Sequence, residues 1–193
     1  FQESYSVLDK NLLLVDIGGT NIRYAYSNIG DSGFVSENKA ELDSLNDFDN
    51  LMSVLLAESD VKHIVFSVAG PKVNNSIKMT NRNFEIDADE IRKKFNLESC
   101  YLLNDWESIG YSIRTFSEND FDNFKDGEAF NDTLLVIGPG TGLGASVISG
   151  NNVIATEIGN TNLGLSALKS LLKINSDEFN VLEDVISGTG ISR

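Results

Sequence analysis

One plan occurs twice in this chain: an apolar run of strand length, a turn rich in glycine and threonine, and a second strand-like run. The first copy spans Leu12–Ser27, with its turn at 18–21. The second copy spans Thr133–Ser149, with its turn at 138–142. Apolar runs of this length that are bounded by glycine predict buried strands joined as hairpins. The duplication constrains the fold more than either hairpin does alone.

Both turns have the composition of an anion-binding loop. Gly18-Gly19-Thr20 and Gly140-Thr141-Gly142 stand at equivalent places in the two hairpins. Glycine bares backbone N–H groups, and successive N–H groups aimed into a concavity bind phosphate. Asp16, just before the first turn, is suited to a hydrated Mg²⁺, which needs few protein ligands. The alternative is a plain hairpin turn beside a buried aspartate.

Other phosphate-binding motifs do not fit. The sequence contains no G-x-x-x-x-G-K-[ST], so a P-loop is excluded. Gly138–Gly144 reads G-x-G-x-G-x-G and leads into a strand-like run, whereas a dinucleotide-binding fold needs a helix there.

Composition excludes several classes of protein. With 193 residues and 41% hydrophobic residues, the chain can bury a core. Its net charge of −14 argues against binding nucleic acid or an anionic membrane. The single cysteine, Cys100, allows neither an internal disulfide nor a zinc site built on several cysteines. We find no secretory signal and no apolar run long enough to span a membrane, so we expect a cytoplasmic protein.

The remaining segments predict an alternation of strands and helices. We expect a central parallel strand at 63–68 and further strands at 34–40, 100–103 and 153–156; the expected helices are at 47–59, 88–95, 106–114, 165–173 and 177–186. The acidic, polar stretch 116–132 is typical of a connection. We therefore predict a small N-terminal α/β lobe at 1–115, the connection at 116–132, and the start of a larger lobe at 133–193.

The ordered set of motifs resembles the bacterial glucokinases of the hexokinase, actin and Hsp70 superfamily. The resemblance runs through the chain from Asp16 to Gly190, in family order. The segments that carry it are Asp16–Arg23, Ala69-Gly70-Pro71, Met79-Thr80-Asn81, Leu103-Asn104-Asp105, Gly138–Gly144, Glu157 and Leu182–Gly188.

The resemblance implies which fold the chain adopts and how much of that fold the chain contains. It implies an α/β ribonuclease-H-like (actin-like ATPase) fold, with a mixed five-stranded sheet flanked by helices and duplicated in two lobes. The family continues beyond the residue that corresponds to Gly188 with an adenosine-binding segment and further helices. We therefore expect the second lobe to be incomplete in this chain.

The resemblance also implies a reaction, the first step of glycolysis: transfer of the γ-phosphoryl group of ATP to the 6-hydroxyl of glucose. Asp105 corresponds to the general base, although by its position it could instead cap the helix that follows. The residues expected to contact the sugar are Asn104, Asp105, Glu157, Glu183, Asn81 and Asn160. The residues expected at the phosphates and at Mg²⁺ are Asp16, Gly18, Gly19, Thr20, Asn21, Gly140, Thr141 and Gly142, with Asp16 as the metal residue.

Two departures from the family pattern leave the substrate open. Asn160 stands where the family has a histidine, and Asn162 replaces a nearby aspartate. A kinase for another hexose or an amino sugar is therefore an alternative, as is a non-catalytic sugar or nucleotide sensor or an actin-like scaffold. We expect the protein to bind a small-molecule substrate and to bind neither nucleic acid nor a membrane. The sequence does not fix the oligomeric state, and a homodimer is one option.

Overall fold

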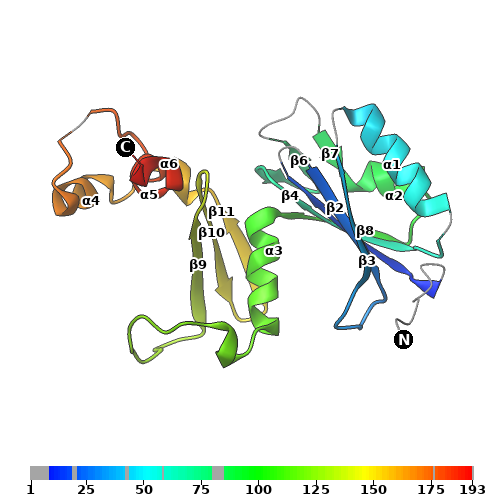
Figure 1. Ribbon diagram of the computed structural model, residues 1–193, viewed down its shortest axis with the longest axis horizontal. Coiled ribbons are helices and arrows are strands. Elements are labelled where there is room, and N and C mark those ends of the chain that lie inside the picture. Colours follow the sequence, from blue (N-terminus) through cyan, green and yellow to red (C-terminus); the bar gives the residue numbers. More distant parts are fainter. Residues whose placement is uncertain are drawn as a thin grey trace. The chain divides into compact units, whose positions relative to one another are not determined.

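The computed structural model describes residues 9–18, 21–41, 44–57, 59–79, 85–175 and 177–192 (Figure 1). The chain divides into two compact units, Phe1–Asp105 and Trp106–Arg193. The first unit therefore ends earlier than the predicted end of the first lobe at 115. The acidic stretch 116–132 belongs to the second unit.

The first unit contains a five-stranded sheet, a small three-stranded sheet and two helices. Their bounds are β1 (Leu12–Ile17), β2 (Asn21–Ser27), β3 (Val35–Glu41), α1 (Leu45–Ala57), β4 (His63–Val68), β5 (Lys72–Val73), β6 (Ser76–Lys78), β7 (Glu85–Asp87), α2 (Ala88–Lys94) and β8 (Ser99–Asn104). The large sheet has the order β3-β2-β1-β4-β8. Strands β1, β2 and β3 pair antiparallel, whereas β4 lies parallel to β1 and to β8. The predicted α/β fold with a mixed five-stranded sheet is confirmed, and so is the central parallel strand at 63–68.

One face of this sheet carries the core of the unit. Alternate residues of β1 and β4 are buried, because successive side chains of a strand point to opposite faces. Helix α1 adds Phe48, Met52 and Leu55, which its period places on one face, and α2 adds Ile91. The centroids of the Phe48 and Phe66 rings lie 5.9 Å apart, so α1 packs against β4.

Parallel pairing brings three strand ends to one edge of this sheet. Ile17 pairs with Val68, and Val68 pairs with Asn104. The chain segments that follow these residues therefore start side by side. They are the first glycine turn, the loop at Ala69 and Gly70, and Asp105.

The second unit contains a three-stranded antiparallel sheet and short helices. The helix α3 (Asp105–Ser112) begins at the last residue of the first unit; the other elements are β9 (Thr133–Pro139), β10 (Leu143–Ser149), β11 (Asn152–Thr156), α4 (Leu165–Leu172), α5 (Glu183–Ile186) and α6 (Gly188–Ile191). The sheet order is β11-β10-β9. Figure 1 shows α3 running beside these strands. Within the described parts of the chain, no helix has both the length and the apolar character needed to cross a bilayer.

The helix predicted at 177–186 is wrong for most of its length, because only Glu183–Ile186 is helical. The carboxylate of Asp184 accepts hydrogen bonds from the backbone N–H groups of Asn180 and Val181, at 2.8 and 3.0 Å. An aspartate that takes these donors favours a turn over a continuous helix.

Candidate functional site

The first glycine turn follows β1 at the edge where the three strand ends meet. Within it, the N–H of Gly18 donates to the carbonyl of Asn21 at 3.0 Å. The predicted phosphate residues Gly19 and Thr20 lie outside the described residues. Asp16 lies two residues before Gly18, and its carboxylate is 3.3 Å from the guanidinium of its cross-strand neighbour Arg23.

Asn104 and Asp105 lie at the same edge, at the end of β8. Asn104 is 4% exposed, and its side-chain N–H donates to the carbonyl of Gly70 at 2.9 Å. Gly70 has a φ of +149°, and a Cβ there would lie 2.6 Å from the carbonyl oxygen of Lys78. The amide of Asn104 therefore holds a loop whose path requires glycine. Asp105 is half-buried and is the first residue of α3. Asn81, which was also predicted to contact the sugar, lies outside the described residues.

The second glycine turn joins β9 to β10 and is held by the α5–α6 segment. The N–H of Gly140 donates within the turn to the carbonyl of Gly142 at 2.8 Å. The Gly140 carbonyl accepts from the N–H of Gly188 at 2.7 Å, and the Thr141 carbonyl accepts from the Thr189 hydroxyl at 3.4 Å. Two carbonyl groups of the turn are therefore hydrogen-bonded to the α5–α6 segment.

Glu183 joins this turn to the loop that follows β11. Its Oε2 accepts from the backbone N–H of Leu143 at 3.3 Å, and the same oxygen lies 3.3 Å from the position of a Cβ on Gly159. Glu157 and Asn160 lie in that loop and contact each other, since the Asn160 amide donates to the Glu157 carboxylate at 3.2 Å. The second unit thus brings together four predicted site elements: the turn, Glu157, Asn160 and Glu183.

A hollow of about 150 Å³ lies at the second turn. It is lined by Thr141, Glu183, Asp184, Ser187, Thr189 and Gly190. The hollow is small and polar. Its lining combines the predicted site residues Thr141 and Glu183 with residues of the segment that holds the turn.

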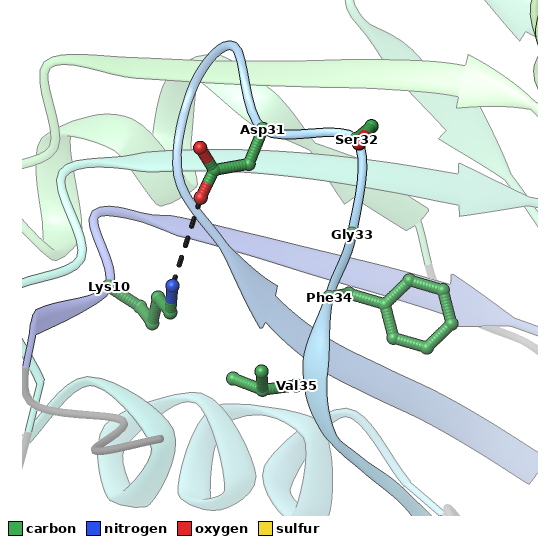
Figure 2. Close-up of a pocket in the computed structure, with 6 residues that line it drawn as sticks. All are labelled: Lys10, Asp31, Ser32, Gly33, Phe34 and Val35. Atoms are coloured by element: carbon green, nitrogen blue, oxygen red, sulfur yellow. Dashed lines mark ion pairs between the residues drawn. The ribbon is translucent and has the colours of Figure 1, made fainter. Parts of the chain in front are cut away.

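A larger hollow, of about 350 Å³, lies in the first unit (Figure 2). Lys10 and the 31–35 segment line it, and the Lys10 ammonium lies 3.8 Å from the Asp31 carboxylate. Figure 2 shows the Phe34 ring turned away from this ion pair. The hollow lies at the end of β1 opposite the glycine turn, since Lys10 precedes β1 and Gly18 follows it. It contains none of the predicted site residues.

No role at the second turn was predicted from the sequence for Gly188, Thr189 or Trp106, although Gly188 lies in one of the segments that carry the family resemblance. Gly188 and Thr189 hold the turn's carbonyls, and Trp106 packs on the strands that flank it. One signal could have found the first two, because Gly-Thr-Gly occurs at 140–142 and again at 188–190. No spacing in the sequence points to the contact of Trp106.

The comparisons with known proteins decide the family. A family model described as Glucokinase matches residues 13–193. The chain belongs to the glucokinase family. The glucokinase of Nostoc punctiforme is 29% identical over 197 residues, which cover 93% of this chain and 58% of that protein. The chain thus spans less than two thirds of the length of this curated relative.

Solved structures agree with the family. The crystal structure of glucokinase from an Antarctic psychrotroph is 27% identical with a TM-score of 0.70, covering 93% of this chain and 61% of that one. The glucokinase from Balamuthia mandrillaris, solved in complex with glucose, is 21% identical with a TM-score of 0.66, covering 98% and 62% of the two chains. The fold is therefore that of the glucokinases, and the predicted membership in this family is confirmed.

Proposed function

We propose that the protein transfers the γ-phosphoryl group of ATP to the 6-hydroxyl of glucose. The observation that carries this proposal is the glucokinase family match, which extends over residues 13–193. The second unit supports it, because a glycine-threonine turn, an acidic side chain and a polar loop lie together there. As an ATP-dependent glycolytic kinase, it would act in the cytoplasm on a small-molecule substrate.

Asp105 is the general base of this proposal. Its carboxylate would accept the proton of the sugar 6-hydroxyl while the O6–phosphorus bond forms and the bond from phosphorus to the ADP oxygen breaks. Its half-buried place after β8 supports the role, since functional groups collect at the carboxyl ends of strands in α/β folds. Phosphoryl transfer depends on positioning and on neutralising charge.

The phosphates would lie on the two glycine turns. On the second turn the N–H of Gly140 is already donated, so the N–H groups of Thr141 and Gly142 and the Thr141 hydroxyl are the donors that we assign. On the first turn the N–H of Gly18 is likewise donated, to the carbonyl of Asn21, so Gly19, Thr20 and Asn21 are the donors that we assign there. In the sugar site we assign Asn104, Glu157, Glu183, Asn81 and Asn160, as the family resemblance implies.

Asp16 fits the requirement of a hydrated Mg²⁺. Its side chain is 47% exposed and its pair with Arg23 is also exposed, so the pair is worth only about 0–1 kcal/mol and competes weakly with a cation. Within the described part of the chain, no cluster of three or more metal-ligating side chains occurs. A magnesium ion held by one carboxylate, waters and phosphate oxygens would match this arrangement. When bound, the ion would neutralise phosphate charge.

We also propose that the second unit is the beginning of a second lobe with the plan of the first. In both units the first three strands are antiparallel neighbours in the order third-second-first. In the first unit the other edge of β1 carries the parallel strand β4. The equivalent edge of β9 has no paired strand among the described residues, and Leu135 and Ile137 on β9 are 57% and 46% exposed. In this proposal a further parallel strand pairs there.

Asn160 favours a second candidate, a kinase for another hexose or an amino sugar. An asparagine amide donates and accepts hydrogen bonds, whereas the family histidine at this position has a different shape and charge. In this structure the Asn160 amide donates a hydrogen bond to the Glu157 carboxylate, so the two side chains would contact the sugar together.

Measured phosphorylation of a panel of sugars tests both candidates. The complete gene product that contains this chain is assayed for ADP release with glucose, fructose, mannose and glucosamine. We expect glucose to give the highest kcat/KM and to raise the Tm more than galactose does. A higher kcat/KM for another sugar would favour the second candidate. ATP hydrolysis that is independent of any sugar would contradict both.

A further inference from the structure

Trp106, the single tryptophan of the chain, lies across two glycines of the second hairpin. A Cβ added to Gly144 would overlap the Nε1, Cε2 and Cδ1 atoms of the indole. A Cβ added to Gly138 would overlap the outer ring, with Cζ2 at 2.8 Å and Cζ3 at 3.2 Å. The indole therefore occupies the space that side chains at both positions would fill.

Gly138 and Gly144 are cross-strand partners that flank the second glycine turn. Directly opposite residues of an antiparallel pair point to the same face of the sheet, so the two glycines together form one flat platform. The glycine-rich motif at 138–144 thus has two parts. Gly140 and Gly142 shape the turn, whereas Gly138 and Gly144 receive the indole.

A second contact holds the same helix one turn further on. Gly110 follows Trp106 by four residues, which places both on one face of α3. A Cβ on Gly110 would lie 2.7 Å from the hydroxyl oxygen of Ser146 and 2.5 Å from Cγ1 of Val153. Helix α3 is thus packed against the sheet at two points, and close-packed contacts of this kind transmit small displacements.

The position of Trp106 in the chain gives this contact a functional meaning. Trp106 directly follows Asp105, which is the first residue of α3 and the proposed base. We propose that Trp106 is a positioning residue, whose packing on Gly138 and Gly144 fixes the first turn of α3 on the strands that carry the second glycine turn. The inference rests on the proposed function. Misplacing a reacting group by about 1 Å can cost on the order of 10²-fold in rate, so a contact that sets this geometry should govern kcat.

The first test compares kcat, the KM for glucose and Tm of the complete gene product in four variants. Trp106→Ala and Gly144→Ala should each lower kcat by about 10-fold or more, toward the 10² limit, with a much smaller change in the KM for glucose. Trp106→Phe keeps a ring on the platform and should recover most of the kcat. The control is Tyr111→Ala, an exposed aromatic on the same helix, which should leave kcat unchanged.

The double variant Trp106→Ala/Gly144→Ala separates direct contact from independent damage. The methyl group that Gly144→Ala introduces collides with the indole but not with the smaller side chain of Trp106→Ala, so the two effects should be less than additive. Emission from Trp106, taken as the difference from the matched Trp106→Phe variant, supplies a readout that needs no activity. In Gly144→Ala it should shift relative to wild type, because the indole is displaced from its platform.

The outcomes distinguish this inference from the proposed function. An unchanged kcat in Trp106→Ala or Gly144→Ala, in an otherwise active enzyme, would overturn the positioning role. Additive effects in the double variant, or unchanged emission in Gly144→Ala, would overturn the contact itself. A wild-type protein that releases no ADP with glucose would instead overturn the proposed function, and the positioning role with it.

Discussion

Replacing Asn104 by alanine removes a buried hydrogen bond between two segments that lie 34 residues apart in sequence. In the structure Asn104 is 4% exposed and donates to the carbonyl of buried Gly70 at 2.9 Å. A buried carbonyl left without its donor costs about 1–3 kcal/mol. We expect the free energy of unfolding to fall by that amount. In a domain of this size the corresponding fall in Tm is roughly 2–12 °C, at about 2–4 °C per kcal/mol.

The matched control is Asn151→Ala. The side-chain oxygen of Asn151 also forms a 2.9 Å hydrogen bond, which it accepts from the Arg114 guanidinium, but both residues are exposed. Surface substitutions of this kind change stability by about 0.5 kcal/mol or less. Urea unfolding measures the difference as a shift in the midpoint at unchanged slope. If Asn104→Ala is no more destabilising than Asn151→Ala, the inference that Asn104 anchors the Gly70 loop is wrong.

Further predictions concern two residues of the first unit, Cys100 and Gly70. Burial raises the pKa of the Cys100 thiol to about 12, with nearby Asp89 adding to the rise. A thiol reagent at neutral pH should therefore label the folded protein far more slowly than the urea-unfolded protein, and equal rates would contradict the burial. Because the folded pKa lies above the ordinary value of 9.0, the unfolded thiol ionises first as the pH rises, so the protein loses stability between pH 9.0 and about 12. Gly70→Ala should lower the free energy of unfolding by more than about 1 kcal/mol, because a positive φ combines with a clash against Lys78. Gly30→Ala, which has φ +92° and open space around it, should cost less, and the reverse order in urea unfolding would refute this account.

The elements that the sequence predicted well are those with a strong local pattern. The strands β1, β4 and β8 are apolar runs bounded by polar residues or glycine, and their predicted bounds agree closely with the structure. The small sheet formed by β5, β6 and β7 was not predicted, since strands of two or three residues have no measurable period. The turn at 180–182 was missed because the Asp184 carboxylate satisfies its N–H groups.

Only those parts of the candidate site that lie in short sequence motifs could be predicted from the sequence. The second glycine turn was predicted from local residues, whereas the Glu157 loop was predicted from the family resemblance. The bond from Leu143 to Glu183 joins residues 40 apart in sequence, and the platform for Trp106 depends on strand register. Contacts of this kind follow from tertiary packing, so no local spacing could have indicated them.

The most direct test of the account is the rate of glucose phosphorylation by Asp105→Asn in the complete gene product. The variant keeps the size of the side chain but removes its capacity to accept the hydroxyl proton. The account predicts a fall in kcat of roughly 10²–10⁴-fold, with the glucose-induced rise in Tm retained. The control is Asp122→Asn, in the exposed acidic stretch, which should keep the wild-type kcat. Wild-type turnover by Asp105→Asn would contradict the assignment of Asp105 as the base.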